Sequence, residues 1–137
     1  MFHHVPLYIC GVYFIRYMKI YVTHSTSFDF QNELYGPLRK SELNMVHEIV
    51  LPHEHSSEQF SSKEFMKECD VVLAEVSYPS TGQGIELGWA NTYNVPIVCL
   101  NKKGMKISGA LKTVSEVFIE YENTEDMVKK LGQYLEK

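Results

Sequence analysis

Short runs of aliphatic, aromatic and β-branched residues recur five times along the chain. They occupy residues 19–23, 47–51, 71–76, 96–100 and 117–121. Runs of this length and composition predict β-strands. The third run is almost continuously apolar, which is typical of a strand that other elements cover on both faces. The pattern therefore predicts five strands, with the third buried inside the fold.

Helical patterns follow the strands at residues 30–43, 61–69, 84–93, 108–115 and 125–135. Pro37 interrupts the first helical pattern and should break or kink that helix. Asn123 or Thr124 is suited to cap the last helix. Five strands alternating strictly with five helices predict right-handed βαβ units. We therefore predict an α/β fold: a three-layer, doubly wound, five-stranded parallel sheet with the flavodoxin-like order 2-1-3-4-5.

The first seventeen residues are apolar and aromatic but do not follow this alternation. They are too short to cross a bilayer, which needs about 20 apolar residues, and they lack the basic start and cleavage site of a signal peptide. Met18 stands directly before the first predicted strand. We expect residues 1–17 to be an extension outside the core, and residues 18–137 to form a single domain. An added edge strand or an oligomer contact is the alternative for residues 1–17.

Composition narrows the class of protein. Hydrophobic residues make up 45% and charged residues 22% of the 137 residues, which argues against disorder. The formal net charge of −4 gives no general attraction for nucleic acid or anionic lipid. Cys10, Cys69 and Cys99 are odd in number and far apart, which suggests neither disulfides nor a thiolate metal site. We expect a cytoplasmic protein that binds neither nucleic acid nor membranes.

Doubly wound sheets bind ligands at the carboxyl ends of their strands, where the strand order reverses. In the predicted order this point lies between the first and third strands, so the loops HSTSFDF and SYPSTGQGIELGWA flank it. Pro79, Gly82 and Gly84 predict a tight turn before a helix whose amides could bind an anion or hydroxyl. The glycines match neither a dinucleotide fingerprint nor a P-loop, so we expect no cofactor.

Glu86 is expected in the first turn of the helix after this turn. One interpretation is that its carboxylate complements the helix dipole, an effect of about 0.3–1 kcal/mol. The other interpretation is chemical. An ionised carboxylate at the ligand end of the sheet is a suitable nucleophile for the anomeric carbon of a sugar.

The run CDVVLAEVSYPSTGQGIELGWA, with KIYVTHS upstream, resembles the nucleoside 2-deoxyribosyltransferase superfamily, including its deoxynucleoside 5′-monophosphate N-glycosidase branch. The resemblance spans most of residues 18–137 in element order. It implies that Glu86 attacks the anomeric carbon to form a glycosyl-enzyme intermediate and that Tyr21 orients it. Ser80 stands where the monophosphate branch has a phosphate-contacting serine. The resemblance also implies a homodimer or larger homo-oligomer.

Two positions depart from the family pattern. Ser62 stands where the family commonly has an aspartate that assists proton delivery to the leaving base. The loop after the first strand offers Thr23, His24 and Ser25 in place of a phosphate-binding arginine. From the resemblance as a whole we expect cleavage or transfer at the N-glycosidic bond of a (deoxy)nucleoside or nucleoside 5′-monophosphate. A non-catalytic nucleotide or sugar-phosphate binding module is the alternative.

Two further groups of residues border the predicted site. Glu75 interrupts an apolar strand, and its carboxylate should either accept hydrogen bonds from loop amides or help position substrate. His53 follows the second strand and is expected to border the pocket. His53 and His55 would point to opposite sides of an extended segment, so we expect no metal site.

Overall fold

The computed structural model describes the backbone of residues 7–10 and 13–15, and residues 16–55 and 62–136 in full. Its main sheet has five parallel strands in the order β4-β3-β5-β6-β7. They are β3 (Lys19–His24), β4 (Glu48–Val50), β5 (Val71–Glu75), β6 (Ile97–Lys102) and β7 (Val117–Tyr121). Counted along the chain from β3, this is the order 2-1-3-4-5. The predicted flavodoxin-like α/β fold is therefore confirmed.

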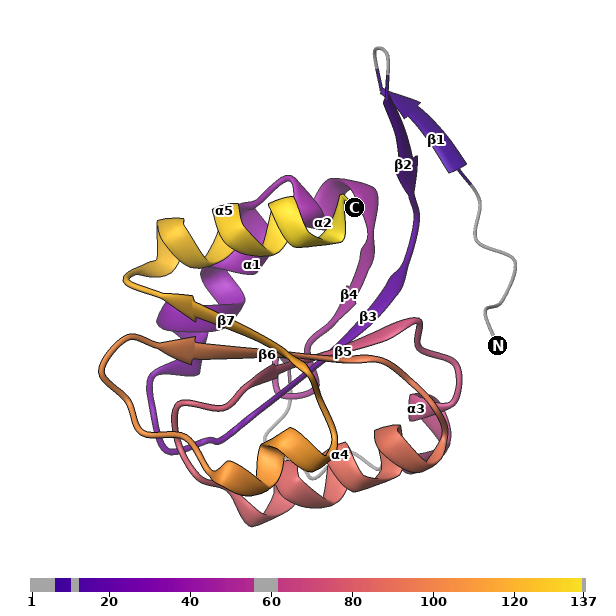
Figure 1. Ribbon diagram of the computed structural model, residues 1–137. Coiled ribbons are helices and arrows are strands. Elements are labelled where there is room, and N and C mark those ends of the chain that lie inside the picture. The colour runs from indigo at the N-terminus through magenta and orange to yellow at the C-terminus, as the bar shows by residue number, and fades with distance from the viewer. Residues whose placement is uncertain (1–6, 11–12, 56–61, 137) are drawn as a thin grey trace.

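Helices cover both faces of the sheet (Figure 1). On one face lie α1 (Gly36–Lys40), α2 (Leu43–Val46) and α5 (Thr124–Leu135). On the other lie α3 (Lys63–Met66), α4 (Thr81–Thr92) and a 3₁₀ turn at Gly109–Thr113. Two separate hydrophobic cores result, one on each side of the sheet. Side chains alternate along a strand, so Tyr21 lies in the core beside α4 while Ile20 and Val22 lie in the core beside α5.

The predicted helix at residues 30–43 is interrupted. A π-helical turn at Gln31–Tyr35 leads into α1, and α2 follows after a break at Ser41. Pro37 occupies the second position of α1, directly after the π-helical turn, and the chain stays helical through Pro37 and breaks only at Ser41. At the other end of the chain, Asn123 caps α5 by accepting a hydrogen bond from the Asp126 N–H at 2.9 Å.

Helix α4 begins three residues earlier than its glycines suggested. Ser80 caps it, because the Ser80 Oγ accepts a hydrogen bond from the Gln83 N–H. Gly82 and Gly84 therefore lie inside the helix, and neither has a positive φ. The predicted tight turn at these glycines is wrong, and Glu86 lies in the second turn of α4 rather than the first.

Residues before the main sheet form a separate hairpin. Strands β1 (Leu7–Cys10) and β2 (Tyr13–Arg16) pair antiparallel with each other, and neither joins the five-stranded sheet. Figure 1 shows this hairpin extending away from the sheet. Residues 1–6 and 11–12 of the expected extension lie outside the described residues. The domain boundary after residue 17 stays a prediction.

Candidate functional site at the carboxyl edge of the sheet

The carboxylate of Glu86 accepts hydrogen bonds from three hydroxyl groups. The Tyr21 hydroxyl donates to Glu86 Oε2 over 2.6 Å, and the Thr23 hydroxyl donates to Oε1 over 2.6 Å. The Ser62 hydroxyl also donates to Oε2. The sequence predicted that Tyr21 and Glu86 would lie together at this edge of the sheet, and they do.

The backbone explains why these groups meet. Tyr21 and Thr23 are two residues apart on β3, so their side chains point to the same face of the sheet. Helix α4 packs on that face through Leu87 and Ala90, which places Glu86 over the end of β3. Ser62 directly precedes α3, which packs against α4. Two separate segments of the chain thus donate to one carboxylate that a third segment, α4, carries.

All three hydroxyl donors keep their protons at neutral pH. Burial, reinforced by the neighbouring Glu86 carboxylate, raises the pKa of Tyr21 far above its usual range. Thr23 and Ser62 are each only 1% exposed and have hydroxyls that do not ionise at neutral pH. An ionised carboxylate can only accept hydrogen bonds, so three hydroxyl donors match it and fix its orientation.

Glu75 lies on the opposite face of the sheet. It accepts hydrogen bonds from the Ser77 N–H at 2.6 Å, from the Ser77 hydroxyl at 3.0 Å and from the Tyr121 hydroxyl. Leu73, two residues earlier on the same strand, belongs with Tyr121 to the core beside α5. Burial raises the pKa of the Glu75 carboxyl. Of the two expected roles, the structure shows the hydrogen bond to a loop amide.

His24 is buried in a cluster of aromatic rings. Its Nδ1 donates to the Ser25 carbonyl at 2.8 Å, so its Nε2 accepts from the Tyr35 hydroxyl at 2.7 Å. That hydroxyl also accepts from the His53 N–H at 3.0 Å. Burial lowers the pKa of His24, which favours the neutral ring. Both ring nitrogens of His24 are thus engaged inside the protein, and the Phe30 ring lies 4.6 Å from the imidazole.

The remaining residues predicted to bind substrate lie in the loop after β3 and at the start of α4. The Ser25 hydroxyl pairs with the Ser27 hydroxyl at 2.7 Å. Gly82 and Gly84 are exposed, and a Cβ added at either would meet no atom within 4 Å. Ser80 is half-buried at the cap of α4. The substrate-binding roles expected for these residues stay predictions.

Sequence reasoning missed two residues at this edge. Ser62 was noted as a departure from a family pattern, yet its hydroxyl contacts Glu86 directly. Gln83 was not singled out, although its side chain is buried and joins α4 to the sheet. The spacing Ser80-Thr81-Gly82-Gln83 could have revealed the start of the helix, because it matches a capping box.

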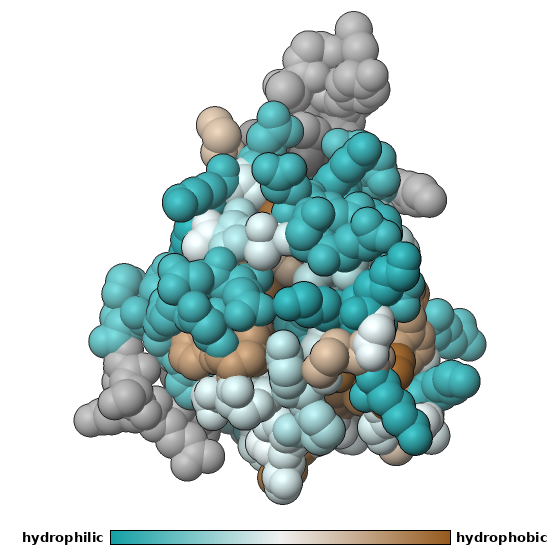
Figure 2. Space-filling view, turned by 90° about the vertical axis from the view of Figure 1, so that its left-hand side faces the viewer, coloured by the Kyte–Doolittle hydropathy of each residue, from teal (hydrophilic) through white to brown (hydrophobic). Residues whose placement is uncertain are grey.

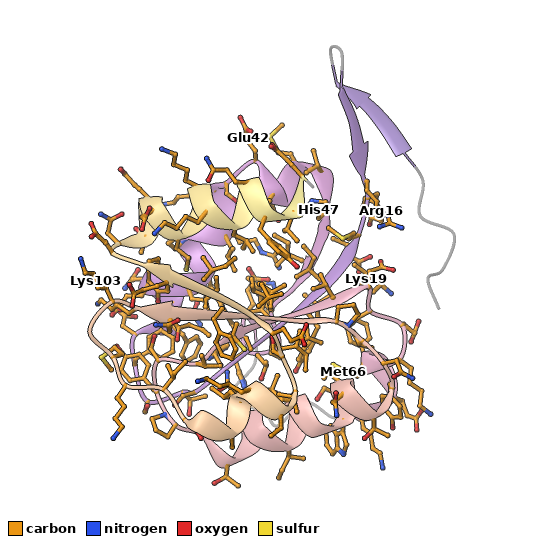
Figure 3. All side chains as sticks on the ribbon, in the orientation of Figure 1. Arg16, Lys19, Glu42, His47, Met66 and Lys103 are labelled. Carbon is orange, nitrogen blue, oxygen red and sulfur yellow. The ribbon has the colours of Figure 1, made fainter. Side chains whose placement is uncertain are left out.

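The surface over this edge is mostly polar. Figure 2 looks at the side to which the β6 and β7 arrowheads of Figure 1 point, and it shows hydrophilic side chains with a smaller hydrophobic area among them. In Figure 3, Lys103 lies at this edge and Lys19, which begins β3, at the opposite one. Within the described ranges, no three His, Cys, Asp or Glu side chains are grouped to hold a metal ion. No described helix is long and apolar enough to span a membrane.

Comparison with known proteins identifies the fold. No protein-family model and no curated protein matches the chain. The CMP N-glycosidase BcmB of Clostridium botulinum is similar in structure, with a TM-score of 0.61 and 22% sequence identity over 83% of this chain and 98% of that chain. A conserved protein from Enterococcus faecalis V583 gives a TM-score of 0.56 and 17% identity over 85% of this chain and 98% of that chain. At these identities the likeness shows a shared fold.

Proposed function

We propose that this protein cleaves or transfers the N-glycosidic bond of a (deoxy)nucleoside or nucleoside 5′-monophosphate, with Glu86 as the nucleophile. The observation that carries the proposal is the Glu86 carboxylate, oriented by the hydroxyls of Tyr21, Thr23 and Ser62 at the switch point of the sheet. The fold shared with a protein described as a CMP N-glycosidase supports the same substrate class. Ser80 and the first amides of α4 lie where a phosphate or sugar hydroxyl could bind.

The proposed chemistry has two steps. A Glu86 oxygen forms a bond to the anomeric carbon as the carbon–nitrogen bond breaks, and the base leaves with the bonding electron pair and takes up a proton. Water then attacks the anomeric carbon, the bond between that carbon and the Glu86 oxygen breaks to restore the carboxylate, and the attacking water releases a proton to the solvent. A second base attacking instead gives transfer. The hydrogen bonds of Glu86 are unequal: Oε2 accepts two and Oε1 accepts one, so Oε1 has fewer hydrogen bonds to lose when it attacks.

Base release from a panel of nucleosides and 5′-monophosphates, followed by chromatography, tests this function. With a cleaved substrate identified, Glu86→Gln should lower the rate by roughly three orders of magnitude or more while ligand binding survives, because shape is kept and the attacking charge is lost. Tyr21→Phe should cost less, because it removes one orienting hydrogen bond and leaves the nucleophile in place.

The matched control is Glu125→Gln, which removes an exposed carboxylate from the first turn of α5. Its rate should equal that of the wild type. A Glu86→Gln variant that releases base at the wild-type rate would contradict the proposal.

A second candidate function is a nucleotide or sugar-phosphate binding module without efficient chemistry. It is favoured by Ser62, because among the described residues the hydrogen bonds to the Glu86 carboxylate come from hydroxyl groups and none comes from a second carboxyl. Calorimetry separates the two functions. Binding of a nucleotide without base release in the panel would support the module, whereas release that depends on Glu86 would exclude it.

A further inference from the structure

Gln83 is the third residue of α4 and is 5% exposed. Among residues 81–86 it is the buried one, since Gly82, Gly84 and Ile85 are exposed and Glu86 is half-buried. A Cβ at either flanking glycine would meet no atom within 4 Å. The two glycines therefore add no side-chain packing to this end of the helix, and the buried Gln83 amide joins its first turn to the sheet by hydrogen bonds.

The Gln83 amide joins the ends of two strands. Its Nε2 donates to the Thr23 carbonyl over 3.2 Å and to the Glu75 carbonyl over 2.7 Å. Thr23 and Glu75 stand at or next to the last residues of β3 and β5, which are neighbours in the sheet. Both hydrogens of the amide are used, one on each strand.

Ser80 and Gln83 have the spacing of a capping box, and the hydrogen bonds of the Gln83 side chain differ from those of that motif. In a capping box the side chain at this position returns to the backbone N–H of the cap residue. Here the Gln83 N–H bonds to the Ser80 hydroxyl, as in a capping box, but the Gln83 side chain turns to the two strand carbonyls. The side chain that could have completed the cap instead attaches the helix to the sheet.

Helix α4 contacts Thr23 at two points. Gln83 donates to the Thr23 carbonyl, and Glu86, one turn further along the helix, accepts from the Thr23 hydroxyl. Residues three apart lie on the same side of a helix, so both contacts belong to one face. A shift of α4 along or about its axis would break both. The other acceptor of the Gln83 amide is the carbonyl of Glu75. The position of Glu75 is itself fixed, because its side chain accepts hydrogen bonds from Ser77 and Tyr121.

We propose that Gln83 is a positioning residue that sets the register of α4 on the sheet and thereby holds Glu86 against the hydroxyls of Tyr21 and Thr23. This inference rests on the proposed function for its kinetic test. Its geometric claim, that the Glu86 contacts depend on Gln83, can be tested without any substrate.

Gln83→Met keeps the length of the side chain and removes both N–H donors. Gln133→Met, at an exposed position of α5, is the matched control. We expect Gln83→Met to lower kcat by roughly 10- to 100-fold with KM almost unchanged, because a nucleophile displaced by about an ångström loses rate more than binding. The control should match the wild type. An unchanged kcat in Gln83→Met, or a loss expressed only in KM, overturns the proposal.

Nuclear magnetic resonance provides the second measurement. The hydrogen-bonded Tyr21 hydroxyl proton is assigned as the downfield resonance that Tyr21→Phe removes. Gln83→Met should shift or broaden it as the Tyr21–Glu86 hydrogen bond lengthens, and Gln133→Met should leave it in place. If the wild type cleaves no substrate, the proposed function fails while this measurement still decides the role of Gln83. An unmoved resonance in Gln83→Met overturns that role.

Gln83→Glu covers the case in which the methionine variant does not fold. The introduced carboxyl has the same shape, repels the two carbonyls when ionised, and donates to one of them when protonated. The ratio of its kcat to that of the wild type should therefore rise as the pH is lowered from about 8 to about 5. A ratio that does not change with pH overturns the proposal.

Discussion

At the scale of single residues, the Glu86 carboxylate accepts hydrogen bonds from uncharged groups. Its hydrogen-bond donors are the hydroxyls of Tyr21, Thr23 and Ser62, and a hydroxyl donor to a carboxylate contributes about 1.5–3 kcal/mol. Of the three donors, Ser62 is the one to replace, because it is buried and donates to the same oxygen, Oε2, as Tyr21. A residue with an acidic proton at position 62 would stand within reach of the same carboxylate.

Replacing Ser62 by aspartate should raise the rate of base release. Two carboxyl groups at this distance in a buried site cannot both ionise, so one retains its proton at neutral pH. That proton can be donated to the leaving base, a contribution of roughly 100-fold or more in favourable cases. The rate constant under saturating substrate is the quantity to measure.

Ser62→Asn is the control for this replacement, because it has the shape of aspartate and no acidic proton. It should fall below the wild type through loss of the hydroxyl donor. Equal rates for the aspartate and asparagine variants would show that the effect comes from size and not from the proton.

These residue positions were predictable to different degrees. The contact between Tyr21 and Glu86 followed from a family resemblance combined with strand order, since β3 and the helix that follows β5 flank the switch point. The contact of Ser62 did not follow, because it depends on how α3, which begins directly after Ser62, packs against α4. The position of Glu86 in its helix was wrong because glycines obscured the Ser80 cap.

At the scale of elements, buried polar groups join the carboxyl ends of three strands. Glu75 ends β5, Tyr121 ends β7, and the Ser77 hydroxyl accepts a hydrogen bond from the Lys102 N–H at the end of β6 over 2.7 Å. Alternating patterns predict where strands run, but not which polar side chains meet between them. The Glu75 network is therefore a property of the assembled sheet.

Tyr121→Phe should lower the free energy of unfolding by about 1–3 kcal/mol. The change leaves a buried Glu75 oxygen without one of its hydrogen-bond donors, and such a group is costly to leave unsatisfied. Urea denaturation measures the effect. Tyr134→Phe, which alters a side chain that is 37% exposed, should change stability little. Equal midpoints for the two variants would show that the Tyr121 hydroxyl contributes nothing.

At the scale of the whole molecule, the strand order was predictable because each strand and helix carries its own hydrophobic period, and right-handed connections leave few arrangements. The hairpin of β1 and β2 was not, since an apolar segment without a clear period fits several structures. The hydrophobic pattern also did not predict hydrogen bonds between segments that are distant in the sequence. His47 gives one of these, because its Nδ1 accepts from the Met18 N–H at 3.2 Å and so joins the start of β4 to the start of β3 (Figure 3).

His47 should make the stability of the whole domain depend on pH. Burial lowers its pKa below the ordinary value of 6.5, so below pH 6.5 the unfolded chain binds a proton that the folded chain does not. The free energy of unfolding should therefore be highest above pH 6.5 and fall as the pH decreases toward the lower folded pKa. His24, whose pKa burial also lowers, acts in the same direction.

His47→Asn isolates the contribution of His47, because an amide oxygen can accept from the Met18 N–H but does not titrate. Urea denaturation between about pH 5 and pH 7.5 should show a shallower loss of stability on acidification than in the wild type. His55→Asn is the control, since the His55 side chain is 89% exposed. If His47→Asn and the wild type lose stability in parallel, protonation of His47 does not oppose folding, and the acid sensitivity of the domain lies with His24 or other groups.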